Sequence, residues 1–305
     1  MKSYNVCIVG GGSTYTLGFL KSFVRLREEF PLKKLVLFDI DAERQEPIGK
    51  YGEILFRERF PELDFSYTTD IKEAYEGMDF VFMQMRAGGL PMRAKDEHIP
   101  LSMGMIGQET CGAGGMAYGL RSCVDMIKAV HDIRNYAPDA WILNYSNPAA
   151  IVAEALRREF PDDKRILNIC DQPENVVRSC SRLLGCNWED LDPVYFGLNH
   201  YGWFTHIYDA HTGEDLLPKI RETIAKNGFL PQDAEISPGW ILMEWYRPSC
   251  LTSRITCRTP MTSTICIRIT RYSTLIRTSP EQMRLWLDVR RESSASVQKL
   301  SRKVS

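Results

Sequence analysis

Apolar residues follow two different spacings in the first forty positions of the chain. A short apolar run, Tyr4–Val9, is followed by three glycines, Gly10–Gly12, which is typical of a buried parallel strand entering a tight turn. Across Thr16–Glu29 the apolar residues recur at helical spacing, and Pro31 follows this segment. Lys34–Asp39 is again apolar and ends on an acid. The pattern predicts a β-α-β unit.

Two more segments have the same strand-like composition. Asp79–Arg86 precedes an Ala-Gly-Gly sequence, and Ala140–Asn144 leads into Ser146-Asn147-Pro148. We therefore expect an α/β fold built on a Rossmann-like, doubly wound sheet. Ligands of such sheets gather beyond the carboxyl ends of the strands, so Arg86, Asn144 and Asn147 are placed to meet one.

The glycine turn predicts a dinucleotide site. Glycines at Gly10 and Gly12 let the backbone approach a pyrophosphate, the next helix offers its first N–H groups, and Ser13 and Thr14 add hydroxyls. An acid at the end of the second strand binds a ribose 2′-hydroxyl and repels a 2′-phosphate, so Asp39 favours NAD over NADP. The alternative is an ordinary β-α-β unit without a nucleotide, because Tyr15 stands where a third glycine is usual.

Size and charge narrow the class of protein. The chain has 305 residues, which predicts two domains or one enlarged domain, and a net charge of −1, which argues against nucleic acid as a partner. No apolar stretch approaches the length of a membrane span, and Met1–Asn5 lead directly into the first strand, so we expect no signal peptide. Nine cysteines without a disulfide-like spacing favour a cytoplasmic location.

A second group of residues carries metal and proton chemistry. Cys170 precedes Asp171, and His200 follows about thirty residues later. A thiolate and an imidazole are ligands for borderline-soft metals, and the carboxyl beside them can move a proton. Each has a plain structural alternative, since a cysteine is commonly a core residue and a histidine commonly a hydrogen-bonded one.

Several motifs occur in one order and together resemble a known family. They are the glycine turn with Asp39, Met92–Glu97, Gly107–Gly112, Asn144–Pro148, Asn168–Asp171 and Gly197–His200. This set resembles the NAD- and metal-dependent family 4 glycoside hydrolases, most of all the 6-phospho-α-glucosidases. The resemblance runs from about residue 4 to about residue 247.

The resemblance implies a glycosidase that departs from the usual pair of carboxylates. NAD would oxidise C3 of the sugar, a divalent metal, usually Mn²⁺, would polarise the neighbouring oxygens, and elimination and hydration would follow. The substrate would be a phosphorylated disaccharide, and family members are homo-oligomers. No membrane partner is implied.

The resemblance also assigns roles to residues. Cys170 and His200 would hold the metal, and Asp171 would protonate the leaving oxygen. Arg93 and Asn147 would contact the substrate, while Glu109 would raise the basicity of the base that takes the C2 proton. Asp171 is typical of the α-specific members, whereas Gln172 is a mild departure from the usual Met.

The composition changes abruptly after Arg247. Residues 248–280 contain no Asp, Glu, Gly, Ala or Lys. We expect an NAD-binding domain over 1–195, the start of a catalytic and substrate domain over 196–247, and an aberrant tail over 248–305. Our hypothesis is a reading-frame change near residue 248 with truncation, leaving the substrate domain incomplete and impairing turnover. The family's tyrosine base is then missing, since neither Tyr246 nor Tyr272 lies in matching surroundings.

Two other functions are compatible with parts of this pattern. A lactate- or malate-type NAD dehydrogenase shares the fold, the glycine turn and the Asn-Pro after a strand, but it has no need of Cys170 and Asp171. An inactive NAD-binding remnant would bind the cofactor without turnover.

Overall fold

The computed structural model describes residues 3–198, 201–227 and 257–258, and its contacts divide the chain into two compact units. The described part of the first unit ends at Ile169, and the second begins at Cys170. The contacts thus separate the chain earlier than the domain boundary that we expect near residue 195.

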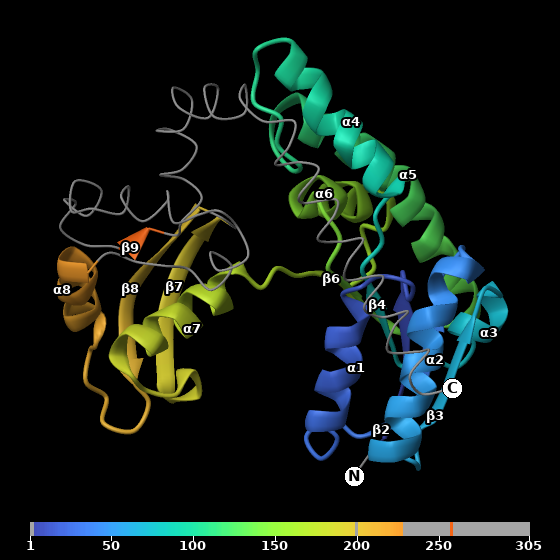
Figure 1. Cartoon of the computed structure of the whole chain (residues 1–305), viewed down its shortest axis with the longest axis horizontal. Coiled ribbons are helices and arrows are strands. Elements are labelled where there is room, and N and C mark those ends of the chain that lie inside the picture. Colours follow the sequence, from blue (N-terminus) through green and yellow to red (C-terminus); the bar gives the residue numbers. More distant parts are fainter. Residues whose placement is uncertain (1–2, 199–200, 228–256, 259–305) are drawn as a thin grey trace. The chain divides into compact units, whose positions relative to one another are not determined.

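The first unit is a six-stranded parallel sheet with the strand order β3-β2-β1-β4-β5-β6 (Figure 1). Its strands are β1 (Tyr4–Val9), β2 (Leu32–Phe38), β3 (Asp64–Thr68), β4 (Phe80–Met83), β5 (Trp141–Asn144) and β6 (Ile166–Asn168). Its helices are α1 (Thr16–Arg25), α2 (Ala42–Arg59), α3 (Ile71–Tyr75), α4 (Gly89–Ser102), α5 (Gly112–Tyr136) and α6 (Ala149–Glu159). The predicted β-α-β start, both later strands and the doubly wound sheet are confirmed.

The central strand β1 is apolar along most of its length, since both faces of the sheet are buried there. In β1, Cys7 and Val9 pack into a core with α3, α5 and α6, whereas Val6 and Ile8 pack into a second core with α1 and α2. All four side chains are at most 3 % exposed. Alternate residues of one apolar run therefore supply two cores, as parallel sheets covered on both faces require.

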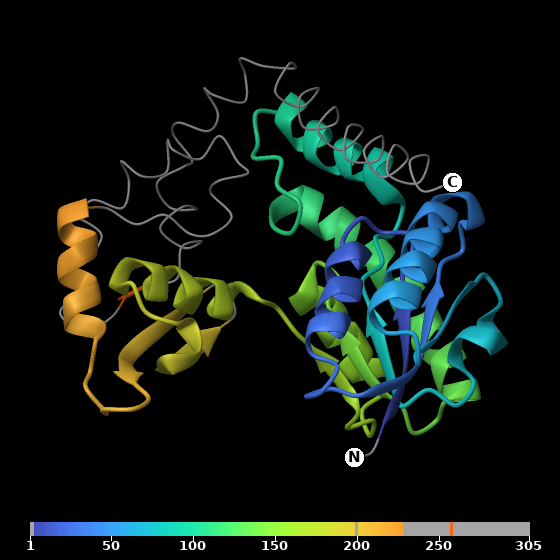
Figure 2. The same ribbon diagram turned by 60° about the horizontal axis from the view of Figure 1, so that its bottom comes forward.

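The second unit has its own core. Helix α7 (Gln172–Leu184) leads through a short 3₁₀ turn (Trp188–Asp190) into the antiparallel strands β7 (Leu191–Leu198) and β8 (Tyr201–Asp209). Helix α8 (Leu217–Asn227), drawn in orange in Figure 2, follows, and β9 (Cys257–Arg258) pairs with β8. Apart from β9, the tail expected over 248–305 lies outside the described residues.

Side chains from both helices and both long strands form that core. Val177 and Cys180 of α7 pack with Phe204 and Ile207 of β8 and with Ile220 of α8. Among the described residues, no helix is long and apolar enough to cross a membrane.

We expect Gly52→Ala to lower the stability of the first unit. A Cβ on Gly52 in α2 would collide with the ring of Phe65 in β3, and the overpacking should cost about 1–3 kcal/mol. Gly18→Ala in α1 is the matched control, because nothing lies within 4 Å of its Cβ position. The control should gain about 0.4–1 kcal/mol from the less flexible unfolded chain. Urea denaturation measures both, and equal effects of the two changes would contradict the packing argument.

Acid should weaken the ion pair between Arg134 and Asp163 (Nε to Oδ2, 2.6 Å), which joins α5 to the segment after α6. Burial alone would raise the pKa of Asp163, but hydrogen bonds from Arg134 and from the Arg165 backbone bring that pKa below its ordinary value. A lowered pKa stabilises the fold above the unfolded pKa, and this contribution is lost as the pH falls through the folded value. The Asp163→Asn variant should therefore be less stable than the parent at pH 7, with the difference shrinking below about pH 4. If the difference in denaturation midpoint between the parent and Asp163→Asn did not change with pH, the charge of Asp163 would not contribute to stability.

Candidate active site

The predicted glycine turn packs directly against the end of β2. The N–H groups of Gly10 and Gly11 both donate to the carbonyl of Phe38, at 2.9 and 2.8 Å. Gly10 has a φ of +83°, and a Cβ on Gly11 would lie 2.8 Å from a side-chain carbon of β2. Only glycine allows this combination of backbone angle and close approach.

Asp39 is 5 % exposed and is bound to the same turn. Its Oδ2 accepts from the N–H of Gly12 at 2.9 Å, and its Oδ1 accepts from the N–H of Asp41 at 3.1 Å. Each carboxylate oxygen can accept more than one hydrogen bond, so these contacts orient the group without exhausting it. Arg44 donates to the carbonyl of Gly12 at 3.1 Å and covers the turn from the side of α2.

The start of α1 completes a cradle that suits a dinucleotide. Ser13 donates its N–H to the carbonyl of Gly10, its hydroxyl accepts from the N–H of Tyr15, and Thr14 is exposed. The N-cap residue Tyr15 makes no side-chain cap hydrogen bond. The first turn of a helix carries N–H groups and a positive dipole end that favour phosphate. Gly10, Gly12, Ser13, Thr14 and Asp39 are therefore brought together, and their arrangement fits the predicted cofactor.

A cluster of charged side chains lies after the end of β4. Glu109 is clamped between two guanidinium groups, those of Arg86 and Arg93, and its Oε2 is 2.9 Å from Nη1 of Arg93. Arg93 also donates from Nε to Glu97 at 2.8 Å. The three side chains of the clamp are 16–23 % exposed, so their charges are only partly screened by water. The structure thus joins two predicted residues, Arg93 and Glu109, through direct contact.

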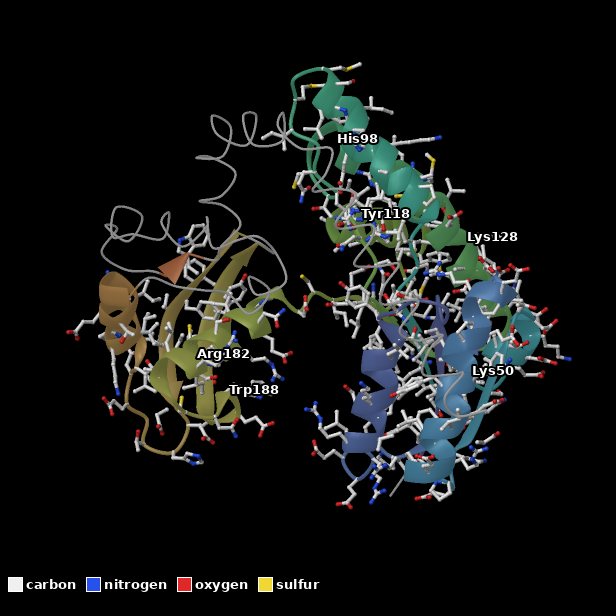
Figure 3. The ribbon with its side chains drawn as sticks, viewed as in Figure 1. Lys50, His98, Tyr118, Lys128, Arg182 and Trp188 are labelled. Carbon is white, nitrogen blue, oxygen red and sulfur yellow. The ribbon has the colours of Figure 1, made fainter. Side chains whose placement is uncertain are left out.

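Three neighbours of this cluster were not singled out from the sequence. Tyr118 of α5 is buried, and the guanidinium carbons of Arg86 and Arg121 lie 5.3 and 5.8 Å from its ring centre (Figure 3). Arg121 also binds the buried Asp96 at 2.5 Å. Burial raises the pKa of the Tyr118 hydroxyl above its ordinary value. A single tyrosine within a helical pattern does not indicate from the sequence that its ring will lie beside two arginines.

The loop that carries Glu109 is held by close backbone packing. The side-chain oxygen of Gln108 accepts from the N–H groups of Thr110 and Cys111, at 2.6 and 2.5 Å. A Cβ on Gly107 would collide with the carbonyl of Glu97 in α4. The glycines of this motif therefore let the loop lie on α4, and this contact places the carboxylate between the two arginines.

Asn147 lies after β5, at the same edge of the sheet. Its side chain is exposed, and its carbonyl accepts from the hydroxyl of Ser122 at 3.3 Å. The bond between Asn147 and Pro148 is cis. Asn144 is fully buried, and its side chain binds Asn168 and the N–H of Ser146, so its amide is used within the turn.

Cys170 and Asp171 open the second unit. The Sγ of Cys170 lies 3.9 Å from Oδ1 of Asp171, and Asn175 donates to the other carboxylate oxygen at 3.0 Å. Asp171 is exposed at the N-terminus of α7. His200, the other predicted metal ligand, lies outside the described residues. Within the described part of the chain, no three His, Cys, Asp or Glu side chains gather closely enough to hold a metal ion.

Two family models match successive parts of the chain. The one described as "Family 4 glycosyl hydrolase" covers residues 5–186, and the one described as "Family 4 glycosyl hydrolase C-terminal domain" covers residues 195–265.

Characterised relatives agree with this match. The phospho-alpha-glucosidase PagL of Clostridium acetobutylicum is 54 % identical over 246 residues, which is 80 % of this chain and 54 % of that protein. A crystal structure of a 6-phospho-alpha-glucosidase from gut microorganisms, in complex with NAD and Mn²⁺, has 69 % identity and a TM-score of 0.82, covering 89 % of this chain and 62 % of that one. A second such structure, with NAD and glucose-6-phosphate, has 38 % identity and a TM-score of 0.80, covering 89 % and 63 %. The chain thus spans about half the length of the curated relatives it matches.

The fold alone is shared more widely. A malate dehydrogenase from Plasmodium falciparum superposes with a TM-score of 0.53 at 12 % identity, covering 89 % of this chain and 78 % of that one. Likeness at this level confirms the dehydrogenase-like sheet and carries no information on activity.

Glu109→Gln should destabilise the first unit, because the amide leaves the two arginines of the clamp without their shared negative charge. Hydrogen bonds to charged groups suggest a loss of about 1–3 kcal/mol in the free energy of unfolding. Glu154→Gln is the control. The side chains of Arg157 and Arg158 lower the pKa of Glu154 to about 2, but this side chain is 45 % exposed and well solvated, so its loss should leave the denaturation midpoint nearly unchanged. An unchanged midpoint for Glu109→Gln as well would mean that the clamp does not contribute to stability.

Proposed function

Because this chain belongs to the family 4 glycosyl hydrolases, we propose that it serves the hydrolysis of O-glycosidic bonds in 6-phospho-α-glucosides. The observation that carries the proposal is a thiol in contact with a carboxyl, Cys170 with Asp171, in a chain that also has a dinucleotide cradle. A hydroxy-acid dehydrogenase has a use for the cradle but not for this pair. The phospho-alpha-glucosidase relative supports the α-anomer and the phosphate as substrate features.

NAD is the proposed cofactor, and its fit rests on the cradle. Gly10, Gly12 and the start of α1 would hold the diphosphate, and the fixed carboxylate of Asp39 would accept from the adenine ribose. When bound, NAD supplies a reversible hydride acceptor for C3 of the sugar. The solved relatives contain NAD.

Substrate contacts are proposed for the first unit. Arg93 would bind the sugar through its guanidinium, and Asn147 offers an exposed amide beyond β5. Glu109 would raise the basicity of the group that removes the C2 proton. Its clamp by Arg86 and Arg93 fixes the position of that carboxylate. We assign the base to no described residue.

Asp171 is the proposed acid. Asn175 donates to Oδ2, and the thiol of Cys170 lies 3.9 Å from Oδ1, so both carboxylate oxygens have an oriented neighbour. Exposure of the side chain at the helix N-terminus gives it access to a ligand. Its role is to protonate the glycosidic oxygen as the C1–O bond breaks.

A divalent metal, Mn²⁺ by preference, would be held by Cys170 together with His200. A thiolate and an imidazole suit a borderline-soft ion, and two protein ligands leave positions for substrate and water. When bound, the metal polarises the sugar oxygens at C2 and C3. The Mn²⁺ in the related crystal structure supports this assignment. We also propose a cytoplasmic homo-oligomer, the location being supported by six free cysteines among the described residues.

Nitrophenol release from the α- and β-glucoside 6-phosphates, with NAD and Mn²⁺ present or omitted, tests the function. We expect release from the α-anomer only, lost on omission of either cofactor. Cys170→Ser should lower the apparent affinity for Mn²⁺ at least tenfold, as lost metal ligation does. Cys123→Ser, which changes a half-buried thiol of α5, should leave it unchanged.

The rival functions predict other results. NADH accumulation with lactate or malate would identify a dehydrogenase. NAD binding without release from either anomer would identify an inactive remnant and would refute the hydrolytic proposal for this chain.

A further inference from the structure

Buried polar atoms without a hydrogen bond gather at one edge of the first unit. Among the described residues, those in this unit belong to Gln45, Gln84, Arg86 and Glu109, and of these the Glu109 oxygen is compensated by its ion pair with Arg86. All four residues lie next to the carboxyl ends of the strands, around the dinucleotide cradle and the charged cluster. Natural proteins pair buried polar groups with protein, water or ligand, so each such atom requires an explanation.

Gln84 is the first residue after β4, and it is fastened to the glycine turn. Its backbone N–H donates to the carbonyl of Val9 at 3.0 Å. Its side-chain Nε2 donates to the hydroxyl of the fully buried Thr16 at 2.6 Å and to the carbonyl of Gly10 at 3.4 Å. A carbonyl only accepts, so the amide nitrogen must face Gly10 and the oxygen must face away. The unpartnered Oε1 is therefore held in one direction.

The strand order indicates which part of a dinucleotide would meet Gln84. β1 lies between β2 and β4, and neighbouring strands are about 4.8 Å apart. Asp39 follows β2, the glycine turn follows β1, and Gln84 follows β4. A dinucleotide with its adenine ribose at Asp39 and its diphosphate on the turn has its second ribose beyond the end of β4.

Because Oε1 of Gln84 can only accept a hydrogen bond, it can bind only those groups of the dinucleotide that donate one. Phosphate oxygens are acceptors, and an acceptor such as Oε1 cannot bind them. The hydroxyls of the second ribose are donors, and the strand order brings that ribose to the end of β4. We infer that Gln84 binds the cofactor directly, its Oε1 accepting a hydrogen bond from a hydroxyl of the nicotinamide ribose.

This inference deepens the proposed function, on whose NAD site it rests. Gln84 would fix the sugar next to the nicotinamide ring, while its Nε2 holds the turn that binds the diphosphate. One side chain would then couple the two halves of the cofactor site. A purely structural glutamine would hold the turn and nothing more.

Calorimetric titration of the full chain with NAD, ADP-ribose and ADP separates these two roles. Gln84→Met should weaken NAD and ADP-ribose about tenfold, which corresponds to about 1.4 kcal/mol. ADP lacks the second ribose, so Gln84→Met should weaken ADP no more than the loss of the tether to the glycine turn does in Thr16→Val. Thr16→Val is the matched control, because it removes the other end of the tether and should not change the ratio of NAD to ADP affinity. Equal weakening of ADP and NAD by Gln84→Met would overturn the inference.

A second measurement changes the ligand in place of the protein and uses Gln84→Met only as a reference. An NAD analogue lacking the 2′- or the 3′-hydroxyl of the nicotinamide ribose should bind the parent chain about tenfold more weakly than NAD for one of the two positions. The same analogue and NAD should bind Gln84→Met alike. Equal binding of NAD and both analogues to the parent would overturn the inference while leaving the hydrolytic function standing. NAD binding without glycoside hydrolysis would refute the function alone, and a chain that binds no NAD would refute both.

Discussion

The backbone contact between the glycine turn and the ends of β2 and β4 is the constraint on which the first unit depends. The N–H groups of Gly10 and Gly11 share the carbonyl of Phe38, and the turn lies against the backbone of Gln84. Side chains would hold these strands farther from the turn. Because no Cβ intervenes, the side chains that follow both strands reach the turn, and Asp39 and Gln84 bind it from opposite sides. The ligand cradle is thus a consequence of how closely three chain segments approach.

The charged cluster beyond β4 is held together by the pairing of opposite charges. Arg86, Arg93 and Arg121 face Glu97, Asp96 and Glu109, so its charges are balanced within the described residues. Partly buried charges are costly without partners, and removing one leaves the others uncompensated. The cluster therefore offers a ligand fixed donors and acceptors without a strong net field. Recognition by such a surface depends on the position of each group more than on total charge.

The sequence was informative where local pattern decides the structure. The apolar runs of β1, β2, β4 and β5, the glycine turn and the strand-end Asp39 follow from periodicity and backbone sterics, and the structure has them. The clamp on Glu109 joins a loop, a strand end and a helix, and no spacing in the sequence predicts which arginine meets which carboxylate. The role of Gln84 could not be predicted from the sequence either, because the orientation of its side-chain amide is set by contacts that exist only in the folded turn. Thr16 likewise looks like an ordinary first helical residue until its hydroxyl is seen to meet Gln84. The pairing of Cys170 with His200 stays a prediction.

The division of the chain between Ile169 and Cys170 has a consequence for how this chemistry is encoded. The residues proposed for cofactor and substrate, from Gly10 to Asn147, belong to a unit with two complete cores of its own. The proposed acid and the thiol beside it are the first residues of a unit with a third core. The two sets of proposed residues therefore lie on separate stretches of the polypeptide, each supported by its own packed side chains. A substitution that loosens one core would thus disturb one set directly and leave the packing beneath the other intact.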